Sequence, residues 1–236
     1  MLRRLCALGS SCLLGCACAG SSPSPELPPP DHCPTVQVEP APGLMLADDV
    51  RAALAASEDR GAIAVRYETR ACELRLEVLS GCGGEGSHYD YRSGVQEVTV
   101  VAGSARQLLK KLPLGTRAAA GQLEGAGLRA DALIVGQLVL APAPDLRRAS
   151  LTGPDCARAT HVVTRIDVGG FTLTSGPAAR LSTPEPWFRT GVQLPSGVER
   201  LRLEGSPSRC AEAKASGERQ ALCAVPLRLG LTPLVD

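Results

Sequence analysis

The sequence predicts an α+β fold in which a mainly antiparallel sheet dominates, one or two short helices pack on it, and disulfide bonds are present. Several segments alternate apolar and polar residues, which is the pattern of half-buried strands. Residues 48–59 and 104–112 combine helical spacing with signals that begin or end a helix. Ten cysteines in 236 residues indicate that the chain folds where thiols oxidise.

The chain begins with a segment that has the composition of a signal peptide. Arg3 and Arg4 precede an apolar stretch, residues 5–14, that is too short to cross a bilayer core of about 30 Å as a helix. We therefore predict that residues 1–15 are a cleaved signal. Residues 16–42, rich in proline and serine, are predicted to be an extended tether, and residues 43–236 a single β-rich globular domain.

The end of this apolar stretch resembles the lipobox of bacterial lipoproteins. Its residues are Leu13-Leu14-Gly15-Cys16. The resemblance implies that Cys16 is diacylated and becomes the first residue of the mature chain, and two acyl chains suffice for stable membrane attachment. Because Ala17 and not Asp follows, it also implies the outer membrane of a Gram-negative bacterium. The alternative is an ordinary secretory signal that is cut after Ala19.

The globular part opens with a predicted helix and a hairpin. Asp48 is expected to cap the helix over residues 48–59, and Gly61 to end it. Residues 63–68 and 73–78 alternate and are close enough in the chain to form an antiparallel hairpin. The second helix is expected to start at Ser104 and to stop before Pro113. Further strands are expected at residues 95–101, 132–140, 160–168, 171–174, 199–203 and 225–231.

The cysteines of the mature body form an even set. They are Cys33, Cys72, Cys82, Cys156, Cys210 and Cys223. Cys210 and Cys223 bracket a polar loop between the last two predicted strands, so we predict that they form a disulfide if these strands are neighbours. The pairing of the other four is left open. The spacings are not those of a zinc site, and no metal is predicted.

Charge and motifs favour a protein without catalysis or cofactor. The formal net charge is +1, which argues against a nucleic-acid partner. Residues 81–86 fit a dinucleotide-binding glycine pattern, but no helix follows them, so we interpret them as a turn. We find no pattern typical of a catalytic serine, a zinc protease or a phosphate-binding loop, and assign no catalytic residue and no cofactor.

Three polar residues of one predicted strand are candidate functional residues. His161, Arg165 and Asp167 are expected to share a strand face, with Val162 and Ile166 on the other face. The structural alternative is a polar ladder on the surface of the sheet. His88 near Asp90 is a second possible acid–base pair, for which a solvated loop is the alternative.

Two resemblances involve this strand. Residues 156–163, together with residues 60–67 and 80–82, resemble a group of predicted myxobacterial lipoproteins, which implies location and a single fold but no activity. Thr160-His161-Val162, followed after six residues by Gly169-Gly170, resembles the signature of membrane-attack-complex/perforin domains. This sequence departs from that signature at Arg158-Ala159 and at Val162, where the family has aromatic residues and glycine.

We therefore expect a lipid-anchored cell-envelope protein whose β-rich domain is structural or binds another envelope protein or a glycan. The tether and the set of cysteines favour this interpretation. One alternative is a diminished perforin-like protein that interacts with membranes. Another is a periplasmic hydrolase whose site would gather His161 or His88 with carboxylates.

Overall fold

The computed structural model describes residues 41–42, 44, 46–70, 73–84, 86–112, 114, 126–142 and 147–235. Predictions for the signal peptide, Cys16, Cys33 and Cys72 lie outside these residues. In the described part of the chain no helix is long and apolar enough to cross a membrane.

The strands are β1 (Ala41–Pro42), β2 (Ala62–Arg70), β3 (Glu73–Gly84), β4 (His88–Ala102), β5 (Gly127–Ala141), β6 (His161–Gly176), β7 (Glu199–Glu204) and β8 (Val225–Pro233). The helices are α1 (Asp48–Ser57), α2 (Ala105–Lys111), α4 (Ala178–Leu181) and α5 (Pro207–Ser216), with short 3-10 turns η1 (Glu58–Arg60), η2 (Arg148–Ser150), η3 (Cys156–Arg158) and η4 (Ala221–Cys223).

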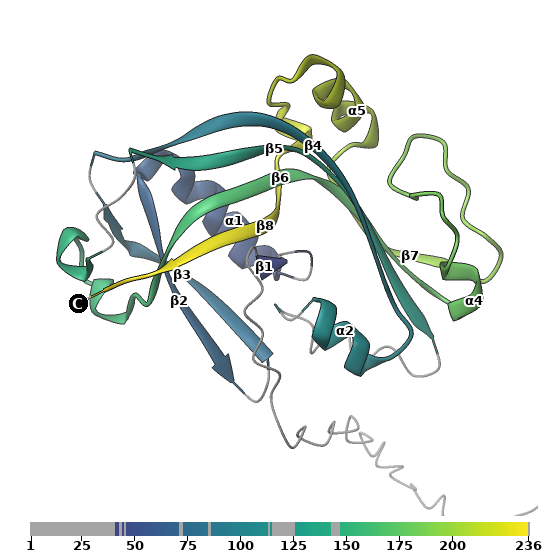
Figure 1. Cartoon of the computed structure of the whole chain (residues 1–236), viewed down its shortest axis with the longest axis horizontal. Coiled ribbons are helices and arrows are strands. Elements are labelled where there is room, and N and C mark those ends of the chain that lie inside the picture. The colour runs from purple at the N-terminus through teal and green to yellow at the C-terminus, as the bar shows by residue number, and fades with distance from the viewer. Residues whose placement is uncertain are drawn as a thin grey trace, which may run out of the picture.

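The fold is α+β and strand-dominated, as the sequence predicts, with one antiparallel sheet of eight strands. Strand β6 is its centre. Ile166 pairs with Leu138 of β5 and with Leu229 of β8, so β5 and β8 lie on opposite edges of β6. Toward its end β6 changes neighbour from β8 to β7. Figure 1 shows β4, β5 and β6 bending together, with α5 on the outer side of the bend and α2 beneath it.

Two apolar clusters cover opposite faces of β6. Ile166 and Val168 belong to a cluster that includes Leu54 of α1. Phe171 belongs to a second cluster, which includes Leu108 of α2. Because side chains alternate along a strand, the even-numbered and odd-numbered residues of this stretch point to different faces. Helix α1 therefore packs on the first cluster through Leu54 and also reaches the second, where Arg51 lies 5.0 Å from the centre of the Phe171 ring, while α2 packs on the second cluster.

Local signals in the sequence predicted several elements correctly. The hairpin of β2 and β3 forms, and the hydroxyl of Ser104 accepts a hydrogen bond from the amide of Gln107 at 3.3 Å, as expected of the residue that caps α2. Ala47, not Asp48, is the residue before α1, and it makes no side-chain cap. Asp48 instead lies in the first turn, where a negative charge is favourable.

Other elements differ from the predictions because of pairing between strands that are distant in sequence. The expected strands at 160–168 and 171–174 are one strand, β6, which continues through Gly169. The expected glycine-rich turn starts later, because residues up to Gly84 belong to β3. Strand β1 pairs Ala41 with Leu229, so the sheet begins inside the range predicted to be tether.

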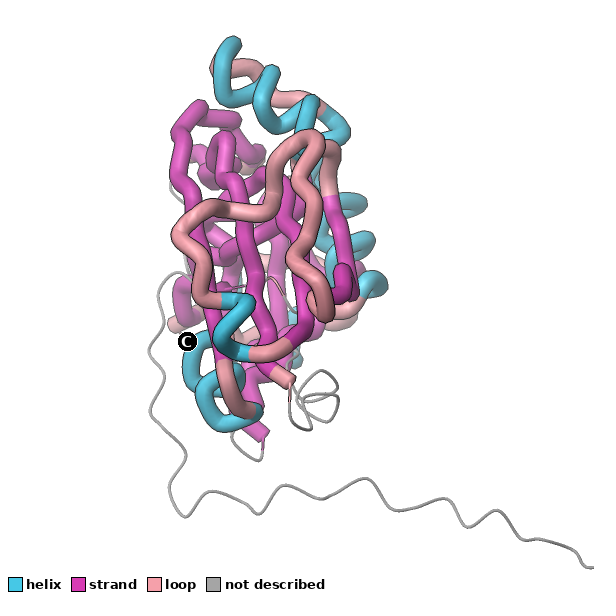
Figure 2. The backbone as a smooth tube through the Cα atoms, turned by 90° about the vertical axis from the view of Figure 1, so that its right-hand side faces the viewer, coloured by secondary structure: helices cyan, strands magenta, loops and turns pink. Residues whose placement is uncertain are grey.

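A buried arginine fixes the long loop between α4 and β7, residues 182–198, to the sheet. Arg129 of β5 is fully buried and forms two hydrogen bonds with Asp131, at 2.7 and 2.9 Å. It also donates to the carbonyl oxygens of Leu181 and Thr183, at 2.9 and 2.6 Å, and lies 4.3 Å from the ring centre of Trp187. Figure 2 shows this loop lying in front of the strands.

Candidate functional site

A cleft lies beside an irregularity of β3. Ile63 pairs with Gly83 and Val65 pairs with Val78, so a single residue of β2, Ala64, lies opposite four residues of β3. Such an insertion forms a bulge that pushes the longer strand away from its partner. The surplus residues, 79–82, form the wall of the cleft.

A disulfide and a backbone bridge hold this bulge in place. Cys82 is bonded to Cys156 of η3, with their Cα atoms 4.9 Å apart. The amide of Gly83 donates to the carbonyl of Thr152 at 3.2 Å, and the amide of Thr152 donates back at 2.9 Å. A side chain at Gly81 would overlap the carboxylate of Asp155, so the bulge and the η3 segment are in close contact.

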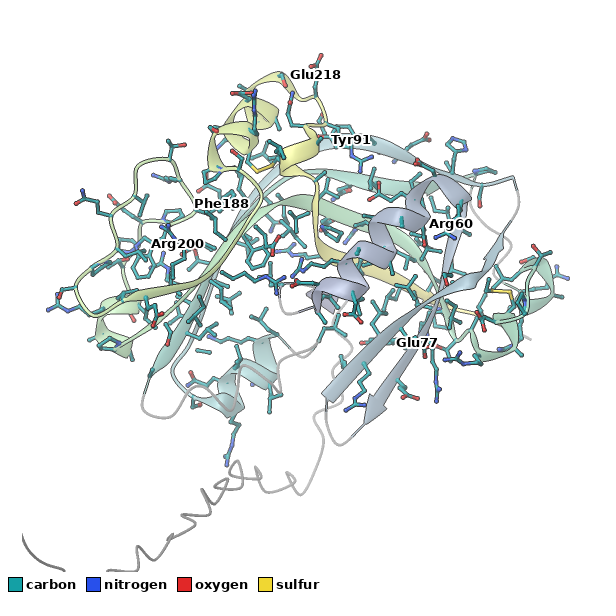
Figure 3. The ribbon with its side chains drawn as sticks, turned by 180° about the vertical axis from the view of Figure 1, so that it is seen from behind. Arg60, Glu77, Tyr91, Phe188, Arg200 and Glu218 are labelled. Carbon is teal, nitrogen blue, oxygen red and sulfur yellow. A yellow bond between two sulfur atoms is a disulfide. The ribbon has the colours of Figure 1, made fainter. Side chains whose placement is uncertain are left out.

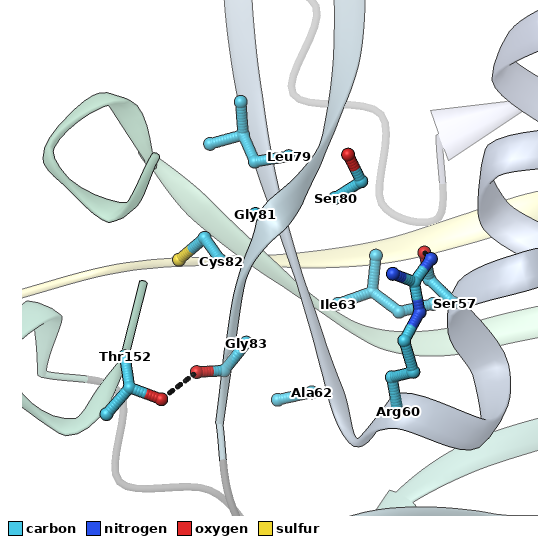
Figure 4. Close-up of a pocket in the computed structure, with 10 residues that line it drawn as sticks. All are labelled: Ser57, Arg60, Ala62, Ile63, Leu79, Ser80, Gly81, Cys82, Gly83 and Thr152. Atoms are coloured by element: carbon cyan, nitrogen blue, oxygen red, sulfur yellow. Dashed lines mark hydrogen bonds between the residues drawn. The ribbon is translucent and has the colours of Figure 1, made fainter. Parts of the chain in front are cut away.

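The cleft has a volume of about 300 Å³ and lies between the end of α1 and this bulge (Figure 4). It is lined by Ser57, Arg60, Ala62, Ile63, Leu79, Ser80, Gly81, Cys82, Gly83 and Thr152. Arg60 is the charged residue of this set, and three hydroxyl side chains accompany it. Figure 3 shows Arg60 at the end of α1.

The hydrogen bonds of Arg60 leave part of its guanidinium free. Its Nε donates to the carbonyl of Ala56 and its Nη2 to the hydroxyl of Ser57, each at 3.1 Å. Within the described residues Nη1 has no partner. A guanidinium presents its donors in a planar fork that matches carboxylate or phosphate oxygens. The cleft can therefore bind a small anionic group, with hydroxyls nearby as further hydrogen-bonding groups.

The structure separates His161 from Arg165 and Asp167. The pairing of β6 with β8 shifts by one residue between Val163 and Arg165. This bulge turns the residues after it to the other face, so Val163 and Ile166 enter the same core although their separation is odd. The expectation that His161 shares a face with Arg165 and Asp167 is wrong for this reason.

Arg165 and Asp167 instead form a cluster with Arg228 of β8, which lies directly opposite Asp167. Arg165 Nε lies 3.1 Å from Asp167 Oδ1, and Arg228 Nη1 lies 4.0 Å from Asp167 Oδ2. Burial raises the pKa of Asp167, and the charges of Arg165 and Arg228 lower it in part. Asp167 is 2% exposed, so it does not belong to a fully solvated ladder.

The two histidine candidates lie on different strands, and each contacts its own partner. His161 Nδ1 lies 2.9 Å from the hydroxyl of Thr160, which also accepts a hydrogen bond from the amide of Tyr67. His88 Nε2 lies 3.1 Å from Asp90 Oδ1, and both side chains are at least half exposed. His161 is on β6 and His88 on β4, so each has its own separate partners.

Of the two disulfides in the described part of the chain, one was predicted and the other joins cysteines whose pairing was left open. Cys210 and Cys223 are bonded, as predicted, with Cα atoms 5.0 Å apart. The Cys82–Cys156 bond joins residues 74 apart in sequence, and no local pattern indicates it. Across the part of the chain that the structure describes, no group of three or more metal-ligating side chains is assembled.

Sequence reasoning missed Arg60 and Arg228. Arg60 precedes Gly61, whose φ of 95° is the conformation that ends the helical segment. From the sequence, Arg60 therefore looks like an ordinary surface residue at the end of a helix. Arg228 looks like the outward residue of an alternating strand. In both cases the residues that complete the site are distant in sequence: the cleft wall at residues 79–83 for Arg60, and Asp167 for Arg228.

Comparison with known proteins adds no relative. No protein-family model matches the chain, and no curated protein matches it.

Proposed function

We propose that this chain is a lipid-anchored protein of the cell envelope, with a domain that binds another envelope component, a protein or a glycan, without catalysis. The pattern of Arg3, Arg4 and residues 5–16 supports export and acylation at Cys16. Two disulfides in the described domain agree with an oxidising compartment. The outer membrane is the membrane that Ala17 favours.

The cleft at Arg60 is the observation that carries the binding role. A single free guanidinium edge, hydroxyl groups and a wall held by a disulfide form a preorganised site for one anionic group. A carboxylate is one such anionic group, and it occurs on acidic peptides and on acidic sugars. The ligand that we propose is an envelope component that carries such a group.

Site-specific crosslinking in intact cells tests this proposal. A photo-reactive residue in place of Ser80, which is exposed and lines the cleft, should give a crosslinked product on irradiation. Adding Arg60→Gln should remove most of that product, because the charge-assisted contact is lost. Arg106→Gln, which removes an exposed arginine of α2, is the matched control and should leave the product unchanged.

The proposal fails if no product forms at position 80, or if Arg60→Gln and Arg106→Gln give the same yield as the unsubstituted chain. Thermal unfolding of each variant shows whether the domain is intact.

A second candidate function is a diminished perforin-like role at membranes. It is favoured by the position of Gly169-Gly170 in a long antiparallel sheet that bends (Figure 1). A side chain at Gly169 would overlap the Leu133 carbonyl, and one at Gly170 would overlap the Phe188 ring, so both positions need glycine. Release of a dye from liposomes by micromolar protein would support this candidate, and retention of the dye would exclude it.

A further inference from the structure

The face of the sheet that carries Phe171 also carries a charged cluster, which we call the arginine pair: Arg165 and Arg228 on either side of Asp167. Strand alternation places Arg165, Asp167 and Phe171 on one face of β6. Near Phe171 this face is covered by α2 and by Arg51 of α1, which lies 5.0 Å from the centre of the Phe171 ring. The side chains of Arg165 and Arg228 are both partly exposed, at 36% and 21%.

The carboxylate of Asp167 leaves hydrogen-bond donors of Arg165 and Arg228 unused. Arg165 Nε and Asp167 Oδ1 are buried and near each other, but they are not aligned as a hydrogen bond and have no other partner in the described residues. Arg228 Nη1 donates to Gln96 Oε1 at 2.9 Å. The terminal nitrogens of Arg165 take part in no hydrogen bond within the described chain, and its side chain is 36% exposed.

The charge of the arginine pair favours an anion. Two guanidinium groups and one carboxylate leave an excess of one positive charge, with Gln137 paired opposite Asp167 as an additional amide. Asp167 keeps the two cations close together, which would otherwise be unfavourable. A phosphate group has enough oxygens to accept hydrogen bonds from both guanidinium groups at once.

An apolar hollow adjoins the arginine pair. It has a volume of about 100 Å³ and shares Arg228 with the pair, while Lys111 supplies another cation at its wall. Its remaining lining residues are Leu44, Val98, Val100, Leu112, Ala132, Ile134 and Leu227. A ligand whose phosphate lies at Arg228 could place the first methylene groups of an attached chain in this hollow.

We propose that Arg165 and Arg228 bind a phosphate group, and that the adjoining hollow selects phosphates that carry an apolar chain. The site is separate from the cleft at Arg60 and does not depend on the function proposed for it. The phosphate could come from a lipid-like molecule or from free phosphate, and these two sources differ in their use of the hollow.

Titration of the full chain in neutral detergent, followed by phosphorus NMR line broadening, tests the proposal. The probes are inorganic phosphate and hexyl phosphate, with Arg165→Gln, Arg228→Gln and the control Arg106→Gln. Each of the first two variants should weaken binding by about tenfold or more, and the control by less than about twofold. Hexyl phosphate should bind the unsubstituted chain about tenfold more tightly than inorganic phosphate if methylene groups enter the hollow.

Equal affinity for both probes, with loss in the two variants, would retain the phosphate site and identify free phosphate as its ligand. Absence of saturable binding, or the same loss in Arg106→Gln as in Arg165→Gln, would overturn the proposal. Urea unfolding of each variant identifies any loss of binding that follows from loss of the fold. Failure here would leave the crosslinking result at position 80 unaffected.

Discussion

His161 illustrates how a single inserted residue redirects a side chain. The bulge at Thr164 turns Arg165 and Asp167 away from the face of His161, whose ring instead packs against Tyr67, with ring centres 5.2 Å apart and planes at 84°. Burial lowers the pKa of His161 below its ordinary value of 6.5. The fold therefore favours the neutral imidazole.

This preference predicts that the domain loses stability as the pH falls below 6.5. In that range the unfolded chain takes up a proton at His161 before the folded chain does, so the free energy of unfolding decreases with decreasing pH. His161→Gln should remove this part of the decrease. Urea unfolding at two pH values, one near neutral and one mildly acidic, measures the difference.

His88→Gln is the control for removing a histidine, because the His88 side chain is 66% exposed. The interpretation of His161 is wrong if His161→Gln and the unsubstituted chain lose the same stability on acidification.

At the scale of elements, the pair of Arg129 and Asp131 connects the long loop to the sheet. Asp131 also accepts a hydrogen bond from the hydroxyl of Thr99 at 2.6 Å, so the carboxylate is satisfied on both sides. The Arg129 side chain has 0% exposure and that of Asp131 has 1%. The loop has no regular structure of its own over most of its length, so these contacts, with buried Trp187 and Phe188, define its position.

Arg129→Met should lower the free energy of unfolding by about 3–5 kcal/mol, because it leaves the Asp131 charge buried without its partner. It should also expose residues 182–198 to protease. The double variant Arg129→Met with Asp131→Leu should cost less than Arg129→Met alone, since no unpaired charge remains. Urea unfolding and limited proteolysis measure these effects, and a single variant as stable as the unsubstituted chain would contradict them.

At the scale of the whole molecule, the two disulfides found among the described residues constrain the chain over very different distances. Cys82–Cys156 spans 74 residues and joins β3 to the segment before β6, whereas Cys210–Cys223 spans 13 residues at α5. A longer closed loop removes more conformations from the unfolded chain. The first bond also holds the wall of the cleft.

Replacing Cys82 and Cys156 by alanine should cost about 4.5 kcal/mol, and replacing Cys210 and Cys223 about 3 kcal/mol, by loop entropy. The first replacement should also reduce crosslinking from position 80, and the second should not. Urea unfolding of both variants checks the order. A larger cost for the Cys210–Cys223 replacement would contradict this explanation.

Membrane attachment is a further property of the whole chain that can be measured directly. We expect the protein extracted from membranes to begin at Cys16 and to have the mass of an acylated chain with oxidised cysteines. The Cys16→Ser variant should no longer be found in the membrane fraction. An unprocessed, reduced chain in the cytosol would refute the anchor and the compartment together.

The predictable part of the fold depended on local chemistry. Ser104 begins α2 because a hydroxyl can accept from an amide a few residues ahead, and the hairpin of β2 and β3 follows from alternation within one short segment. The Cys210–Cys223 bond was predictable because both cysteines lie in the one short connection between β7 and β8. Each of these features involves residues near one another in the chain.

The sequence alone therefore determined that this is a strand-dominated α+β chain with two short helices in its first half and a disulfide near its end. The tertiary structure decided which side chains meet. The bulge at Thr164 depends on pairing with β8, which is far away in sequence, and one extra residue exchanges the faces of all that follow. The bulge at residues 79–82 lies within the hairpin of β2 and β3, but it is held by contacts with Thr152 and Cys156, which are distant in sequence. The cleft at Arg60 and the arginine pair both arise beside these bulges, so only the folded sheet could place them.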